Sequence, residues 1–230
     1  MNTGIYIADT AALEDPVLYE GFYAAMPLWR KEKIDALRLQ RDKRLSLGAG
    51  IALQKALSDI GIQQMPAIAC GANGKPYFPK RPALRFNLSH SKTKVMCALS
   101  DWEVGCDVEK IASANLRVAK RFFSAREYDL LAAQSDEEEQ KVLFCRIWTL
   151  KESFLKATGK GLSLPMNCFS VCPNGESIHF EQSFDSDFYD FFEMDVADGF
   201  RYACCLKHAS FDEPPEIFRL DFQTGNTSPL

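Results

Sequence analysis

Two short stretches of this chain carry carboxylates at spacings that bring them to one surface. Trp148, Glu152 and Lys156 are each four residues apart, so on a helix they stack along one face within about 12 Å. Asp107 and Glu109 alternate with apolar residues, so on a strand they point the same way, about 6.6–6.8 Å apart. Carboxylates placed in this way repel one another unless a cation lies between them, and oxygen ligands favour a hard ion such as Mg²⁺ over zinc.

Each pattern also has a simple structural explanation. Glu152 and Lys156 form an i,i+4 pair of the kind found on solvated helices, worth only ~0.2–0.5 kcal/mol, and a bare Asp-x-Glu is more often two solvated acids. Together, however, Asp107, Glu109 and Glu152 can hold Mg²⁺ and leave positions for water and a substrate phosphate. With a nearby lysine, the set predicts phosphoryl transfer, in which positioning and charge neutralisation supply most of the catalysis.

The elements that must position these side chains are visible in the hydrophobic pattern. Apolar residues at helical spacing from Leu143 to Phe154 predict an amphipathic helix that ends at Gly159. Val104–Val108 reads as a strand that follows Val95–Leu99 across a short turn. A Ser124-x-x-Glu127 capping box gives Glu127 a complete structural explanation.

The most cationic part of the chain precedes these motifs. Residues 28–60 have a helical pattern with few breakers, and most basic residues on a long helix are simply solvated. A cluster of seven within 15 residues could nevertheless hold a small polyanion. The seven are Arg30, Lys31, Lys33, Arg38, Arg41, Lys43 and Arg44.

Two further stretches add polar residues to loops. Gly71–Tyr77 is dense in breakers and contains Lys75, but it does not match a P-loop. A strand that begins at Leu84 leads Ser89 and His90 into a loop. They do not form a hydrolase pair, because adjacent strand side chains point to opposite faces and no Gly-x-Ser-x-Gly elbow is present.

Composition excludes several classes of protein. The chain has 230 residues, 25% of them charged, and a net charge of −4, so it is not expected to bind nucleic acid. It contains no apolar run long enough for a membrane span and no secretion signal. Its eight cysteines show neither Cys-x-x-Cys nor zinc spacing. We interpret them as buried thiols in a reducing cytoplasm.

The order of predicted elements suggests an internal duplication. A strand, helices and further strands occur once from the N-terminus and again from about Val104. We therefore expect an α+β fold, a pseudo-dimer of two similar α/β halves. The expected boundaries are 1–103 for the N-terminal half, 104–210 for the C-terminal half and 211–230 for an extended or frayed tail.

In their order and spacing, these motifs resemble the Sfp-type 4′-phosphopantetheinyl transferases. The similarity is close over about residues 70–170 and loose over most of the chain. The four matching motifs are Gly74-Lys75-Pro76, Phe86-Asn87-Leu88-Ser89-His90-Ser91, Gly105-Cys106-Asp107-Val108-Glu109 and Trp148-Thr149-Leu150-Lys151-Glu152-Ser153-Phe154-Leu155-Lys156. Two further stretches look like those of the family, Lys120-Arg121-Phe122-Phe123-Ser124 and Gly159-Lys160-Gly161-Leu162-Ser163-Leu164-Pro165.

The resemblance implies a site in the cleft between the two halves and a defined reaction. The phosphopantetheine group of coenzyme A, a substrate, passes to a serine of an apo acyl or peptidyl carrier protein, and adenosine 3′,5′-bisphosphate is released. By resemblance, Asp107, Glu109 and Glu152 hold Mg²⁺, Glu152 is the base, and Lys156 binds the pyrophosphate and assists the leaving group. The remaining implied coenzyme A contacts are Arg30, Lys33, Arg44 and His90 for the 3′-phosphate, and Lys75, Pro76 and Ser89 for the nucleotide pocket.

The resemblance also suggests a docking surface and a cellular role. Residues 111–124 are expected to meet the carrier, with Phe122 and Phe123 as apolar contacts and Arg117, Lys120 and Arg121 as partners for its acidic residues. A cytoplasmic monomer that serves secondary metabolite biosynthesis is the expectation. Two alternatives are a Mg²⁺-dependent hydrolase that uses the same carboxylates and a non-catalytic binding module. The natural carrier, the choice between Mg²⁺ and Mn²⁺, and direct or water-mediated binding by Glu109 stay open.

Overall fold

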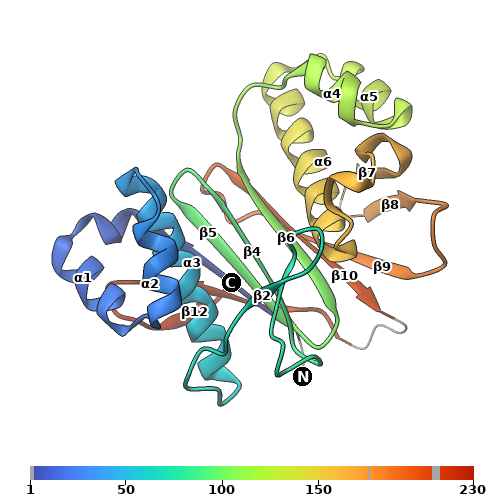
Figure 1. Cartoon of the computed structure of the whole chain (residues 1–230). Helices are drawn as coiled ribbons and strands as arrows, with labels where there is room; N and C mark the ends of the chain where they lie inside the picture. The colour runs from blue at the N-terminus through green and yellow to red at the C-terminus, as the bar shows by residue number, and fades with distance from the viewer. Residues whose placement is uncertain (1–2, 176, 209–212) are drawn as a thin grey trace. The chain divides into compact units, whose positions relative to one another are not determined.

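The computed structural model describes residues 3–175, 177–208 and 213–230, which fold into two compact units. Figure 1 shows the fold of the chain, coloured from blue at the N-terminus to red at the C-terminus. No helix in these described ranges is long and apolar enough to cross a membrane. The first unit contains residues 1–69, 76–101 and 212–230, and the second contains residues 70–75 and 102–211.

A five-stranded sheet and three helices form the first unit. The strand order is β12-β11-β1-β5-β4, and α3, the longest helix of the unit, contacts β1 and β5. The elements are β1 (Gly4–Asp9), α1 (Pro16–Ala25), α2 (Leu28–Asp35), α3 (Gln40–Asp59), β4 (Arg85–Ser91), β5 (Lys94–Ser100), β11 (Glu216–Leu220) and β12 (Thr227–Pro229). Two short strands, β2 (Ala69–Cys70) and β3 (Pro76–Tyr77), flank the loop that carries Lys75.

The second unit repeats part of this plan. Its three-stranded sheet has the order β6-β10-β9, and a separate pair is formed by β7 and β8. The long helix α6 contacts β6 and β10. The elements are β6 (Glu103–Lys110), α4 (Leu116–Phe122), α5 (Ala125–Ala132), α6 (Glu137–Thr158), β7 (Ser170–Asn174), β8 (Ser177–Glu181), β9 (Phe188–Met194) and β10 (Phe200–His208).

The predicted α+β class and the similarity of the two halves are confirmed by strand order. β1-β5-β4 in the first unit and β6-β10-β9 in the second are both antiparallel throughout. In the first unit β1 pairs with β5, and in the second unit β6 pairs with β10. In the described part of each unit, three α-helices lie between these two strands in the sequence, and the last of the three is the longest. Each unit also has its own buried apolar core, centred on α3 in one and on α6 in the other.

The C-terminal segment is not a frayed tail. β11 pairs in parallel with β1, and β12 pairs with β11, so both extend the sheet of the first unit. Leu220 and Phe222 are 3% and 2% exposed and belong to the core of that unit. Residues 213–230 thus contain extended backbone, one of the two predicted alternatives, and they belong to the first unit rather than to a separate tail.

Local signals explain the length and position of α6. Asp136 caps its first turn by accepting from the backbone of Glu139, and three glutamates follow in that turn, where they suit the positive end of the helix dipole. Gly159 ends the helix in the left-handed conformation, with φ of 66°, which favours glycine. The capping box of α5 is present, with the Ser124 and Glu127 side chains each bonded to the other's backbone.

Candidate active site

The acidic motifs of β6 and α6 meet in the second unit. Lys156 Nζ on α6 donates to Asp107 Oδ1 on β6 at 2.6 Å and to the Cys106 carbonyl oxygen at 3.0 Å. The Asp107 side chain is only 5% exposed, whereas that of Lys156 is 27% exposed. The lysine therefore lies at the edge of the site and the aspartate at its base.

Gly105 makes this close approach of helix and strand possible. A Cβ atom at this position would lie 2.0 Å from the Ser153 carbonyl oxygen and 2.3 Å from the Ala157 nitrogen. Both are backbone atoms of α6 that flank Lys156, so they cannot rotate away. The glycine two residues before Asp107 thus sets the distance between the aspartate and the lysine.

The charges of the site act on one another. Burial raises the pKa of Glu152, and the negative charges of Asp107 and then Glu109 raise it further, against the opposing effect of Lys156. Burial alone lowers the pKa of Lys156, but Asp107 and Glu152 outweigh it and the net change is upward. Asp107, Glu109, Glu152 and Lys156 are therefore one electrostatic group, with three acids and a protonated lysine.

The donor set fits a hard divalent cation, although no metal site is preassembled. Asp107, Glu109 and Glu152 offer only carboxylate oxygens. Burial is the largest cause of the raised pKa of Glu152, and the negative charges of Asp107 and Glu109 add to it, a repulsion that a cation would relieve. Among the residues described here, however, no three His, Cys, Asp or Glu side chains are gathered closely enough to hold a metal ion. The three-ligand Mg²⁺ site therefore stays a prediction.

A basic pocket of about 490 Å³ lies in the first unit. It combines Arg44 and His90, two predicted 3′-phosphate contacts, with Arg41, a member of the predicted basic cluster, and Lys92, which was not predicted. Arg44 donates to Glu14 at 3.1 Å within the pocket. The remaining lining residues are Thr10, Ala11, Asp42, Leu45, Ser91 and Thr93.

Arg30 and Lys33 do not line this pocket. Arg30 is 3% exposed, and its Nη2 atom donates to the Ser46 carbonyl oxygen at 2.5 Å. Burial lowers its pKa to about 10. This position is at odds with a phosphate contact at the surface, since the guanidinium lies inside the first unit. Lys33 is exposed on α2.

The other predicted nucleotide contacts lie on different elements. Lys75 Nζ donates to Glu103 at 2.6 Å and to the Ala157 carbonyl oxygen at 2.8 Å, so it stabilises the C-terminal end of α6. Pro76 is half-buried in β3, and Ser89 is 7% exposed on β4.

A second pocket, of about 260 Å³, lies in the second unit and was not predicted from the sequence. It lies beside Glu109 and is lined by Val118, Phe144 and Trp148. The Phe144 and Trp148 rings stack with centroids 6.1 Å apart. Their i,i+4 spacing within the predicted helix is the sequence signal from which this ring contact could have been predicted. The other lining residues are Lys110, Ala112, Ser113 and Cys145.

Sequence comparisons agree with this geometry. Residues 103–205, which contain β6, α6 and all four charged site residues, match the 4′-phosphopantetheinyl transferase superfamily. The chain is 42% identical to 4′-phosphopantetheinyl transferase Sfp of Bacillus subtilis (strain 168) over 144 residues, 61% of this chain and 62% of that protein. It is 32% identical to 4′-phosphopantetheinyl transferase ffp of Bacillus subtilis over 216 residues, 91% of this chain and 93% of the relative.

A partial likeness to a solved structure accompanies these matches. Holo-[acyl-carrier-protein] synthase of Thermotoga maritima aligns with a TM-score of 0.39 and 19% identity, over 47% of this chain and 64% of the other. The family assignment depends on the match to ffp, because 32% identity extends over 91% of this chain and therefore through both units. The chain belongs to the 4′-phosphopantetheinyl transferase family.

Proposed function

We propose that this protein transfers the 4′-phosphopantetheine group of coenzyme A to a serine of an apo carrier protein. The observation that carries the proposal is the group formed by Asp107, Glu109, Glu152 and Lys156, within the segment that matches the superfamily. Its three acids and one ammonium match the needs of phosphoryl transfer between two oxygens. Relatives named as 4′-phosphopantetheinyl transferases support the same reaction.

The reaction exchanges one P–O bond for another. The serine oxygen of the carrier attacks the β-phosphorus of the coenzyme A pyrophosphate, and the bond to the bridging oxygen breaks. Glu152 accepts the serine proton, directly or through water. Lys156 stabilises or protonates the departing phosphate of adenosine 3′,5′-bisphosphate.

Asp107, Glu109 and Glu152 are the residues that would hold Mg²⁺. When bound there, the ion would neutralise charge on the pyrophosphate. The pairing of Asp107 with Lys156 at 2.6 Å already balances part of the acidic charge. Lys156 is the more exposed partner and is therefore available to a phosphate oxygen.

The basic pocket supplies a candidate site for the 3′-phosphate. We assign Arg44 and His90 to this role, together with Arg41 and Lys92 from the same pocket. Arg41 is paired with Asp42 and Arg44 with Glu14 in the same pocket, so a bound phosphate would take the place of these carboxylates. A doubly charged phosphate suits several cationic groups better than one. We assign Lys75 to the support of α6 instead, and Arg30 to the interior of its unit.

Carrier docking is proposed on α4 and the segment before it. Arg117, Lys120 and Arg121 are exposed and suit an acidic partner. Phe122 is half-buried against Trp148, whereas Phe123 is 3% exposed and packs in the core, so only the former can contact a carrier. Arg117→Glu should reduce carrier binding and leave coenzyme A binding unchanged; equal loss of both would contradict the docking site.

Cellular setting and assembly are also proposals. All eight cysteines are free thiols, which is typical of a reducing compartment and supports a cytoplasmic location. The repeated plan of two units within one chain supports a functional monomer, because a second copy is not needed to supply a second α+β half.

The direct test weighs apo-carrier proteins by intact-mass spectrometry after incubation with coenzyme A and Mg²⁺. A gain of one phosphopantetheine group is expected on at least one carrier, and EDTA or Asp107→Ala should abolish it. Asp101→Ala, on the turn before β6, is the matched control. Cleavage of coenzyme A with every carrier unmodified would favour a hydrolase, and binding without either reaction would favour a non-catalytic module.

A further inference from the structure

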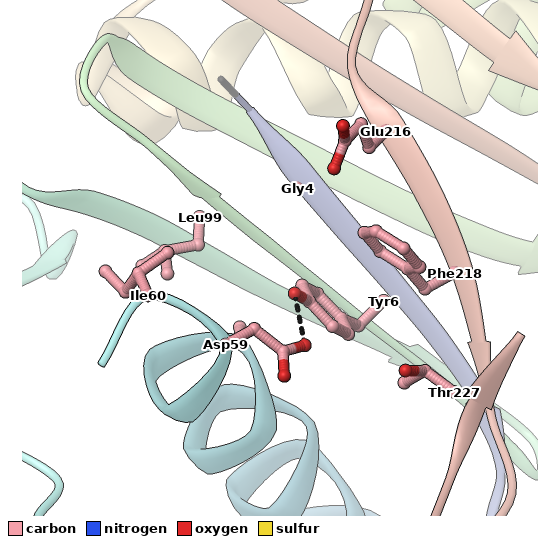
Figure 2. Close-up of a pocket in the computed structure, with 9 residues that line it drawn as sticks. Gly4, Tyr6, Asp59, Ile60, Leu99, Glu216, Phe218 and Thr227 are labelled. Carbon is pink, nitrogen blue, oxygen red and sulfur yellow. Dashed lines mark hydrogen bonds between the residues drawn. The ribbon is translucent and has the colours of Figure 1, made fainter. Parts of the chain in front are cut away.

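A separate pocket of about 490 Å³ opens in the first unit where the C-terminal end of α3 meets the sheet (Figure 2). It shares no lining residue with the basic pocket. Two rows of paired strand residues form its base. Gly4 is paired with Glu216 on β11 and Leu99 on β5. In the next row on the same face, Tyr6 is paired with Phe218 on β11.

Aromatic rings provide one wall of this pocket. The Tyr6 and Phe218 rings stack with centroids 5.1 Å apart and an interplanar angle of 28°, and Figure 2 shows them side by side. At Gly4, an added Cβ would lie 3.1 Å from Tyr6 Cε2. Glycine therefore leaves a notch in the sheet surface beside the rings, where any other residue would fill it. Leu99 and Ile60 contribute further apolar surface.

The charged groups that line the pocket are all acidic. They are Asp59 and Glu216, and no Lys, Arg or His is among the nine lining residues. Tyr6 Oη donates to Asp59 Oδ2 at 2.8 Å (Figure 2), and the other oxygen of Asp59 is paired with Lys55. In the described ranges, the Glu216 carboxylate takes part in no ion pair, so its charge faces the pocket uncompensated.

Tyr6 adds ring surface but no negative charge. Burial raises the pKa of Tyr6, as do its hydrogen bond to Asp59 and the negative charges of Asp59 and Glu216. The phenol therefore stays neutral at physiological pH. The electron-rich faces of neutral aromatic rings attract cations, and the attraction grows where water is excluded.

We propose that this pocket binds a small organic cation, with an ammonium, amidinium or guanidinium group beside Glu216 and an apolar body against Tyr6 and Phe218. The pocket supplies acceptors and aromatic faces, which a cationic donor complements and an anion does not. Its volume is within the range of about 300–1,000 Å³ found for small-molecule sites.

Benzamidine and benzamide form a matched pair of probes, because they have the same shape and differ in charge. Binding to the full chain is measured by calorimetry or by ligand-observed NMR at low salt. Benzamidine is expected to bind roughly two- to fivefold more tightly than benzamide, as a charge contact with the exposed Glu216 would provide. Equal affinity for the two probes, or no binding of benzamidine, would overturn the proposal.

Two variants locate the binding. Glu216→Gln should reduce benzamidine affinity to that of benzamide, whereas Glu213→Gln, an acid outside the pocket on the same segment, should leave it unchanged. Gly4→Val should abolish binding of both probes by filling the notch. If Glu216→Gln keeps its thermal midpoint and still prefers benzamidine, the site is elsewhere and the proposal fails. Transfer activity with coenzyme A should be unaffected by Glu216→Gln.

Discussion

Two lysines five residues apart on α6 have opposite surroundings. Lys151 is 0% exposed and donates to both carboxylate oxygens of Glu127 at 2.7 Å and to the Phe169 carbonyl oxygen at 2.9 Å. Lys156 is 27% exposed and bonds Asp107. All three protons of the Lys151 ammonium are satisfied internally, so Lys151 is a structural residue. Lys156 is the residue that we propose for binding a substrate phosphate.

Lys156→Gln is expected to lower the rate of carrier modification by about 10²–10³-fold, the usual loss when one group that stabilises transition-state charge is removed. Single-turnover kinetics by intact mass measures the chemical step. The free energy of unfolding should also fall, because Asp107 is only 5% exposed and would lose its cationic partner, so rates are compared at a temperature where both proteins are folded. Lys141→Gln, which removes a surface lysine at the start of the same helix, is the control; a similar loss there would contradict the assignment.

Lys151→Met should reduce the free energy of unfolding by about 3–5 kcal/mol, because Glu127 would remain buried without its counter-ion. Urea denaturation measures the change. The double variant Lys151→Met/Glu127→Gln should recover part of the loss, since it removes the uncompensated charge. If the double variant is less stable than Lys151→Met alone, the ion pair is not the cause.

Cysteine reactivity should follow exposure. Cys70 and Cys168 are exposed and the other six thiols are buried. Burial raises the pKa of Cys145 to about 12 and raises those of Cys204 and Cys205 well above the ordinary value, so their reactive thiolates are scarce at pH 8. Iodoacetamide should therefore label two sites in the folded chain and eight after unfolding, as counted by peptide mass spectrometry.

At the scale of elements, the contact between β6 and α6 decides the geometry of the site. Gly105 lies under the backbone of α6. Leu150 and Phe154 of α6 belong to one buried apolar cluster with Ala203 and Cys205 of β10, which pair with Asp107 and Gly105 of β6. Apolar burial holds the two elements together. This packing brings Lys156 of α6 to hydrogen-bond distance of Asp107 on β6.

Gly105→Ala should destabilise the second unit by about 1–3 kcal/mol or more, because the added methyl meets backbone that can only move as part of the helix. It should also lower activity by displacing Lys156 from Asp107. Gly21→Ala is the matched control. Nothing lies within 4 Å of its Cβ position in α1, and alanine should stabilise that helix by about 0.5–1 kcal/mol. Thermal unfolding of both variants gives the comparison.

At the scale of the whole molecule, the C-terminal segment of the chain belongs to the first unit. Residues 212–230 belong with residues 1–69 and 76–101, so the second unit is inserted between the strands of the first. Truncation before β11 should expose the β1 edge and the side of the core that Leu220 and Phe222 cover. We expect loss of cooperative unfolding for the first unit in hydrogen exchange, with the second unit protected.

A shorter truncation separates the two strands. Removal of residues 227–230 deletes β12, which is exposed or half-buried and pairs only with β11. It should reduce stability modestly and leave the first unit folded, since β11 still covers β1. Equal damage from both truncations would contradict a distinct role for β11.

The sequence determined the local parts of this protein because local chemistry specified them. Spacing alone placed Asp107 on a strand and Glu152 with Lys156 on a helix face, and the capping box of Glu127 is present as predicted. The ordered motifs also identified the family, since four short patterns at matching positions rarely coincide. Each of these signals lies within a few residues of chain.

Tertiary structure alone decided what each side chain meets. Nothing local distinguished buried Arg30 from Arg44 in the basic pocket, because both follow the same cationic helical pattern. Nothing local showed that Lys75 supports α6 or that β11 pairs with β1. The contact of Lys75 with Ala157 joins residues 82 positions apart, and the pairing of β1 with β11 joins residues more than 200 positions apart. The free energy of packing that selects such contacts depends on the whole chain and cannot be predicted from any one segment.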